Sequence, residues 1–224
     1  MQPATPDGAP GRFAYVVIRV PKSGSTSLAN MMRDALAGAT VHEMPTDADV
    51  MRDRPLIERL RQARKLRRAL RRGYGTTSME AAWRQLAGRM QAGDVVTGHI
   101  RYGDPQLPDM RLRYITLVRD PVARALSHYN YSRIGFNKRH FIQKLYHFGP
   151  DSVAGRRDFS SYLAYLDEHR ALFGNIAARY VLGRAPVDDP AAFLRTHYFH
   201  VGSVENMPHF LRRLGDKLGV PVAM

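Results

Sequence analysis

The sequence contains no cysteine, and its acidic residues are few beside its basic ones. Without cysteine, disulfides, thiolate catalysis and cysteine-ligated zinc or iron–sulfur sites are excluded. A long apolar run is also missing, because the early apolar segment 13–20 is short and includes Arg19, whereas a membrane span needs about 20 residues. Residues 1–12 lack the basic start and apolar core of a secretory signal. We therefore expect a flexible tail at 1–12, no transmembrane segment and a cytoplasmic protein.

The charge balance is strongly basic. The 224 residues include 34 Lys and Arg against 20 Asp and Glu, which gives a formal charge of +14. A field of this size favours polyanionic partners such as acidic glycans, anionic lipid, nucleic acid or phosphate-bearing cofactors. Basic residues concentrate in a predicted helical insertion at 55–92 and in a basic, aromatic segment at 133–158 that we expect to be irregular. Peripheral contact with anionic surfaces is compatible with both segments.

Short β-branched stretches alternate with segments of helical periodicity. The stretch 13–20 is apolar on both faces, which is typical of a strand buried in a parallel sheet. Further strands are expected at 40–43, 94–98, 113–118 and 198–202, and helices at 28–37, 55–72, 78–90, 121–132, 160–182, from 190 onwards, and at 208–218. This alternation predicts an α/β fold with a mostly parallel sheet. Ligands bind at the carboxyl ends of the strands in such sheets, so functional residues are expected there.

A loop of small residues follows the first predicted strand. It consists of Pro21, Lys22, Ser23, Gly24, Ser25, Thr26 and Ser27 and leads into a predicted helix. The helix dipole places about half a positive charge at such a terminus, and Lys22 and the hydroxyl groups add further donors. The lysine precedes the glycine, so the loop is not a Walker A loop. The pattern predicts an anion cradle; the alternative is a polar turn with a Ser or Thr cap.

A second group of polar residues follows the strand 113–118. Asp120 and Pro121 are suited to the N-cap and the first position of a helix. On that helix a buried stripe is expected at Val122, Leu126 and Tyr129, and the opposite side at Arg124, Ser127, His128 and Tyr131, at about 100° per residue. Arg119 and Ser127 are placed to clamp a second phosphate. The alternative is a capped helix with a solvated face.

His99 follows the short strand 94–98 on the presumed ligand edge. An imidazole that titrates near neutral pH is a suitable general base for a hydroxyl group. A purely structural histidine is the alternative.

Together these segments resemble the sulfotransferases that use 3′-phosphoadenosine 5′-phosphosulfate (PAPS). The segment 19–28 resembles their 5′-phosphosulfate loop, and 118–127 resembles their 3′-phosphate motif. Thr97-Gly98-His99 resembles the catalytic segment of the heparan sulfate uronosyl 2-O-sulfotransferase branch. The resemblance implies a soluble, bacterial-type member of that branch. Segments 175–183 and 201–205 agree more weakly. The resemblance spans about 13–219 within an expected single domain at 13–224. It implies a P-loop-NTPase-like three-layer sandwich.

The resemblance also implies roles. Lys22 would contact the oxygen that bridges sulfur and phosphorus and the oxygens of the leaving group. Ser23 to Ser27 would hold the 5′-phosphate, and Arg119 with Ser127 would hold the 3′-phosphate. His99 would take the proton of an acceptor hydroxyl, adenosine 3′,5′-bisphosphate (PAP) would leave, and no metal is needed. We expect a carbohydrate acceptor, as a glycan or glycolipid, contacted by Arg101, Tyr131, Arg133 and Lys138.

Two other functions remain open from the sequence. A basic nucleic-acid-binding module would explain the charge by phosphate contacts, but not the paired loop and Arg119–Ser127 motifs. A PAPS-binding protein without turnover would share the motifs but lack the reaction.

Overall fold

The computed structural model describes residues 12–44, 79–145, 149–184 and 186–222. Residues 1–11 of the tail expected at 1–12, the predicted helix at 55–72 and Ser78 lie outside this part of the chain. Within it, five parallel strands form one sheet in the order β2-β3-β1-β4-β5. They are β1 (Phe13–Ile18), β2 (Val41–Glu43), β3 (Val95–Gly98), β4 (Arg111–Val118) and β5 (Tyr198–Ser203).

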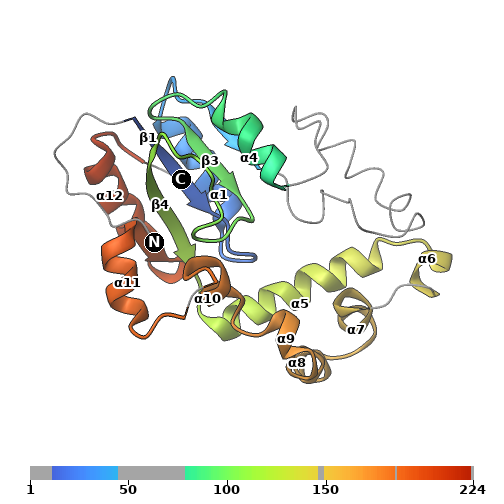
Figure 1. The fold of residues 1–224 in the computed structure, drawn as a ribbon. Helices are drawn as coiled ribbons and strands as arrows, with labels where there is room; N and C mark the ends of the chain where they lie inside the picture. Colours follow the sequence, from blue (N-terminus) through green and yellow to red (C-terminus); the bar gives the residue numbers. More distant parts are fainter. Residues whose placement is uncertain (1–11, 45–78, 146–148, 185, 223–224) are drawn as a thin grey trace.

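Helices cover both faces of the sheet (Figure 1). On one face, α1 (Ser25–Ala35) and α12 (Met207–Leu218) pack on a cluster that includes Val17 and Leu117. On the other, α4 (Met79–Ala87), α10 (Ile176–Val181) and α11 (Pro190–His197) pack on a cluster that includes Val16 and Trp83. Successive side chains of a strand point to opposite faces, so β1 serves both clusters. The predicted α/β sandwich with a parallel sheet is confirmed.

A second group of helices lies beside the end of β4 (Figure 1). It comprises α5 (Pro121–Asn137), α6 (Phe141–Leu145), α7 (Pro150–Arg156), α8 (Phe159–Glu168) and α9 (Arg170–Phe173). A small cluster of Tyr129, Ala154 and Tyr162 joins α5, α7 and α8. We call α5 to α9 the helical lobe. Residues 133–158 were expected to be irregular, and this was wrong, because α5 continues to Asn137 and α6 and α7 follow.

The predicted buried stripe of α5 was wrong for Val122 and Leu126 and right for Tyr129. Val122 and Leu126 are exposed, at 67% and 44%, whereas α7 and α8 cover a face made of Ala125, Tyr129, Ser132 and Phe136. Apolar residues occur on several sides of this helix, so its pattern does not single out one stripe. The neighbours that decide the buried face come later in the chain. None of the described helices is both long and apolar enough to cross a bilayer.

The strand β5 and the helix α12 approach each other closely at Gly202. A Cβ atom there would lie 2.2 Å from the ring of Phe210, which is 2% exposed. Gly202→Ala therefore requires Phe210 to move, and overpacking of this kind costs about 1–3 kcal/mol. We expect a lower free energy of unfolding in urea titrations.

Gly135→Ala in α5 is the matched control for this substitution. A Cβ atom at Gly135 meets nothing within 4 Å, and alanine is the better helix former by up to about 1 kcal/mol. Equal stability of Gly202→Ala and the parent protein would contradict the packing described at Phe210.

Candidate functional site

The N-terminus of α1 is open. The helix begins at Ser25, three residues earlier than predicted, so Ser25 to Ser27 form its first turn instead of a loop. Its N-cap is Gly24, in the left-handed region at φ 64°, with no side-chain cap and no acidic residue in the first turn. By contrast, aspartate side chains cap α5, α8 and α11. The first N–H groups of a helix lack acceptors within the helix, so this end of α1 is suited to an anion.

The loop before α1 has unusual backbone geometry. Lys22 has φ 68°, a conformation that is uncommon outside glycine and frequent at functional sites. Ser23 is 0% exposed, and its hydroxyl oxygen has no hydrogen-bond partner among the described residues. Buried hydroxyl groups are nearly always paired, so the hydroxyl of Ser23 has hydrogen-bonding capacity that the described residues do not use. Left-handed residues such as Lys22 and Gly24 turn successive N–H groups into a concavity that suits anions.

Arg119 joins the two motifs found in the sequence. Its Nη1 donates to the backbone oxygen of Lys22 at 3.4 Å, across 97 positions of sequence. Its Nε is buried and has no partner in the described part of the chain. β1 and β4 are adjacent in the sheet, so the residues that follow them meet at one edge. The guanidinium thus lies against the loop with donor capacity left over.

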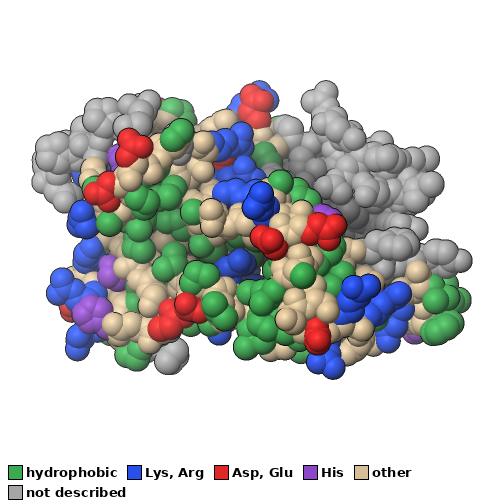
Figure 2. Space-filling view, turned by 90° about the horizontal axis from the view of Figure 1, so that it is seen from below, with side chains coloured by type: hydrophobic (Ala, Val, Ile, Leu, Met, Phe, Trp, Pro, Cys, Tyr) green, Lys and Arg blue, Asp and Glu red, His purple; other side chains and the backbone are tan. Residues whose placement is uncertain are grey.

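The helix after Arg119 presents a basic face to the loop. The Nζ of Lys22 lies 3.9 Å above the centre of the Tyr131 ring, a cation–π contact. Burial and the charge of Arg119 lower the pKa of Lys22, and burial lowers the pKa of Arg124. Figure 2, which views the molecule from the side where β4 ends, shows Lys and Arg side chains around a hollow between the sheet and the helical lobe. This edge therefore carries a positive potential that favours anionic ligands.

His128, on the same face of α5, is held neutral. Its Nδ1 lies 2.6 Å from the hydroxyl of Tyr162, and burial raises the pKa of Tyr162 to about 12. The hydroxyl therefore keeps its proton and donates to Nδ1. Burial, with the charges of Arg124 and Lys22, lowers the pKa of His128. The helix thus adds a neutral imidazole to a basic face.

Arg19 organises the other side of the loop, a role the sequence did not indicate. Its Nη1 pairs with Glu43 at 2.9 Å, and its Nη2 donates to the hydroxyl of Thr26 at 2.9 Å. Thr26 was expected to bind the ligand, and its hydroxyl is bonded to Arg19 in this structure. The proximity of Arg19, Thr26 and Glu43 depends on pairing between β2 and β3, which sequence patterns do not specify.

His99 lies at the same edge of the sheet. Its Nδ1 is 2.7 Å from the backbone oxygen of Arg19. A carbonyl oxygen only accepts, so Nδ1 carries the proton of the neutral ring, and Nε2 is the basic nitrogen. This tautomer is the one that a general base at Nε2 requires.

The remaining predicted residues are spread along α5 and the loop after β3. Ser127 is half-buried, Arg101 is half-buried with its N–H bonded to Asp104, and Arg133 and Lys138 are exposed. The 17 residues of α5 span roughly 25 Å, so Lys138 lies far from Arg119 along the helix. The structure therefore brings together Lys22, Arg119 and Tyr131, but not Lys138.

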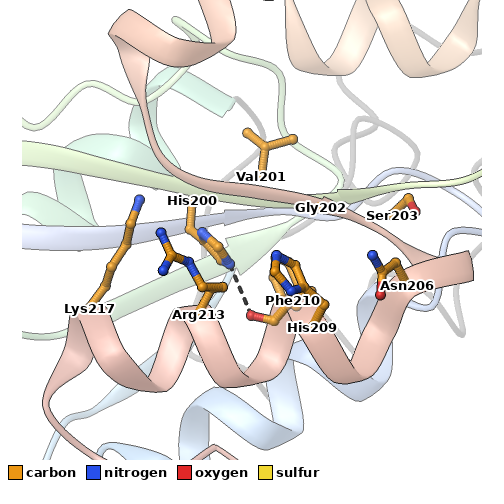
Figure 3. Close-up of a pocket in the computed structure, with 9 residues that line it drawn as sticks. All are labelled: His200, Val201, Gly202, Ser203, Asn206, His209, Phe210, Arg213 and Lys217. Atoms are coloured by element: carbon orange, nitrogen blue, oxygen red, sulfur yellow. Dashed lines mark hydrogen bonds between the residues drawn. The ribbon is translucent and has the colours of Figure 1, made fainter.

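Two further hollows are lined by residues outside the loop 21–27. One, of about 300 Å³, runs between β5 and α12 beside His200, Arg213 and Lys217 (Figure 3). The other, of about 480 Å³, includes Trp83 and Tyr102. Among the described residues, no group of three or more metal-ligating side chains is present.

Comparisons with known proteins give distant structural matches. No protein-family model matches the chain, and no curated protein does. An unliganded sugar kinase from Janibacter sp. matches with a TM-score of 0.41 and 17% identity, over 94% of this chain and 96% of that one. The mouse sulfotransferase SULT7A1 complexed with PAP matches with a TM-score of 0.37 and 15% identity, over 97% of this chain and 62% of that one. The functional argument therefore depends on the residues of the site.

The buried histidines predict how stability depends on pH. The pKa of His128, and likewise that of His200 by burial, lies below the ordinary value of 6.5. Below pH 6.5 these histidines are protonated in the unfolded chain but not in the folded chain. The free energy of unfolding therefore falls as the pH drops, by up to about 1.4 kcal/mol per pH unit for each histidine. Urea titrations at pH 7.5 and pH 5 measure this slope.

His128→Asn keeps an acceptor near Tyr162 and removes the titrating ring. We expect the slope to decrease in this variant and to decrease further when His200→Asn is added. An unchanged slope in the double variant would show that neither histidine is held neutral.

Proposed function

We propose that this protein transfers a sulfuryl group from PAPS to an acceptor hydroxyl. The observation that carries the proposal is the hydrogen bond from Arg119 to the carbonyl of Lys22, because it joins the two motifs that resemble phosphate sites. A module that binds nucleic acid needs spread phosphate contacts. It does not need two anion sites that meet at one sheet edge.

The described residues fit the donor nucleotide. The open N-terminus of α1, the unpaired hydroxyl of Ser23 and the ammonium group of Lys22 are suited to the 5′-phosphosulfate. The unpaired Nε of Arg119 and the half-buried hydroxyl of Ser127 are suited to the 3′-phosphate. PAPS supplies an activated sulfuryl group and needs no metal from the protein.

The reaction needs a base and a group that neutralises charge. The Nε2 atom of His99 takes the proton from the acceptor hydroxyl, whose oxygen bonds to sulfur while the bond between sulfur and the phosphate oxygen breaks. Negative charge accumulates on that phosphate oxygen, where Lys22 and the N–H groups of α1 stabilise it. As in phosphoryl transfer, positioning and electrostatic stabilisation supply most of the catalysis. PAP leaves, and His99 returns its proton to water.

The proposed acceptor is a carbohydrate, in a glycan or glycolipid. This choice depends on the resemblance of Thr97-Gly98-His99 to the uronosyl 2-O-sulfotransferase branch. Tyr131, 64% exposed beside Lys22, is the side chain best placed to contact a sugar ring. Arg101, Arg133 and Lys138 are proposed to contact acidic groups of a longer acceptor.

Binding of PAP tests the donor site without knowledge of the acceptor. At 100 times Kd, a ligand that binds only the native state adds about 2.7 kcal/mol, which is roughly 5–10 °C in Tm for a domain of this size. We expect this rise with PAP, and much less with AMP, which lacks the 3′-phosphate. Arg119→Ala removes the difference between PAP and AMP, whereas Arg195→Ala, on the exposed surface of α11, retains it.

Equal rises in Tm with PAP, AMP and ATP at fixed salt would indicate a basic surface without a nucleotide site. That result would favour the nucleic-acid-binding module. Selective binding without PAPS turnover against any hydroxyl acceptor would identify a PAPS-binding protein without the reaction.

The kinetic prediction separates Lys22 from His99. Once an acceptor is known, Lys22→Ala is expected to lower kcat about 10²–10³-fold, the usual loss for one donor to a developing charge, while Kd for PAP rises much less. His99→Ala is expected to lower kcat about 10²–10⁴-fold and to abolish the acid limb of the pH–rate profile.

Lys217→Ala and His209→Ala, both on α12, are the matched controls and retain the parent kcat. Full activity of Lys22→Ala would remove Lys22 from the reaction. An unchanged pH profile in His99→Ala would assign the base elsewhere.

A further inference from the structure

The far end of the helical lobe has an unusual surface. At α6, beyond the end of α5 (Figure 1), Phe141 is 76% exposed, Ile142 69% and Leu145 52%. Three neighbouring apolar side chains on one short helix form a contiguous patch instead of the single exposed residues that are normal on protein surfaces. We call these three residues the α6 tip.

Contacts on its inner side hold the α6 tip in place. Arg156 donates to the backbone oxygen of Lys144, and the ammonium of Lys144 lies 5.6 Å from the centre of the buried Phe136 ring. Arg139 pairs with Asp151 of α7 at 2.9 Å. Arg139 and Lys144 thus contact α7 and Phe136, while Phe141, Ile142 and Leu145 stay exposed. A surface helix ordinarily exposes its charged side chains and buries its apolar ones.

The charge around the α6 tip is mostly positive, and Asp151, the acidic residue next in the chain, is paired with Arg139. Residues 121–150 contain Arg124, Arg133, Lys138, Arg139 and Lys144 and no aspartate or glutamate. Arg133, Lys138 and His140 are exposed. Figure 2 shows hydrophobic side chains at the end of the molecule that carries α6, with Lys and Arg side chains beside them. Exposed apolar side chains next to unneutralised cations match an anionic bilayer, which offers an acyl region below a layer of negative headgroups.

We propose that the α6 tip is a membrane-docking site, at which Phe141, Ile142 and Leu145 enter the headgroup–acyl boundary of an anionic bilayer. Arg133 and Lys138 contact the headgroups. A second copy of the chain is the less suitable occupant, because the cations around the α6 tip would face one another across a symmetric interface. The α6 tip is separate from the proposed donor site and base, because it involves neither Lys22, Arg119 nor His99; Arg133 and Lys138 are the residues that it shares with the proposed acceptor contacts.

Vesicle flotation tests the site in the absence of PAPS. We expect the full chain to float with vesicles of phosphatidylcholine and 30% phosphatidylserine, and much less with phosphatidylcholine alone. Phe141→Ser with Ile142→Ser lowers the partition coefficient at least about tenfold, as expected for two bulky apolar side chains. Lys138→Ala and Arg133→Ala each lower it roughly fivefold. Leu172→Ser on α9, a position that is 67% exposed, and Arg195→Ala are the matched controls and retain binding.

A tryptophan probe distinguishes insertion of the α6 tip into the bilayer from electrostatic adsorption to the bilayer surface. Trp83 is 2% exposed in the core and far from α6 in sequence. Phe141→Trp is expected to gain fluorescence that brominated phosphatidylcholine in the same anionic vesicles quenches, whereas Leu172→Trp is not quenched.

Each alternative outcome overturns the proposal. Binding that persists in Phe141→Ser with Ile142→Ser and is lost in 0.5 M salt would indicate a basic surface that only adsorbs. Concentration-dependent dimers that the same double variant abolishes, with no flotation of the parent, would identify a second copy as the occupant. Normal PAP binding together with failed flotation would reject the docking site alone and leave the proposed function standing.

Discussion

The capacity of the carboxyl edge of the sheet to bind an anion depends on the N-terminus of α1, which has no side-chain cap. Aspartate side chains close the starts of α5, α8 and α11, and Glu205 accepts from the N–H of Asp120 at 3.0 Å beside α5. At α1 the chain instead supplies a glycine cap, a left-handed lysine and a buried hydroxyl without a partner among the described residues. Neighbouring cations raise the positive potential at this end, because Arg119 lies against the loop and lowers the pKa of Lys22. Such an arrangement costs stability in the absence of a ligand and favours an anion that satisfies the donors.

The helix α5 connects this edge with the opposite end of the molecule. It starts next to Arg119, presents Tyr131 to Lys22, and ends roughly 25 Å away beside the α6 tip. If a bilayer holds the α6 tip, Lys22 and Tyr131 stand within about one length of α5 of the membrane. A glycolipid headgroup or a glycan close to the surface would then be the natural acceptor. The donor site and the α6 tip nevertheless depend on different residues, so either can fail without the other.

Much of the fold could be predicted from the sequence because its signals are local. The strands predicted at 13–20 and 113–118 correspond to β1 and β4, with ends that differ by two residues. Asp120 caps α5 with Pro121 in its first turn, as expected. The buried face of α5 could not be predicted, because α7 and α8 decide it from a later part of the chain. The start of α1 was predicted three residues late. Serine and threonine are typical of loops and N-caps, and the sequence does not show that Gly24 takes the N-cap position. The bonds of Arg19 to Glu43 and Thr26, and of Arg119 to the loop, depend on the order of strands in the sheet, which no local pattern contains.

The measurement that tests the central claim most directly is ³¹P NMR of PAP titrated with the protein, because its two phosphates give separate signals. With the parent protein, both resonances are expected to move and to saturate together at one site. With Ser127→Ala, the 3′-phosphate signal is expected to return toward its free position while the 5′-phosphate signal stays shifted. With Lys22→Ala, the 5′-phosphate signal is the one that is expected to change. Equal, unsaturating shifts of both signals that disappear in moderate salt would contradict a nucleotide site built from the loop and Arg119, and would leave a basic surface without specificity.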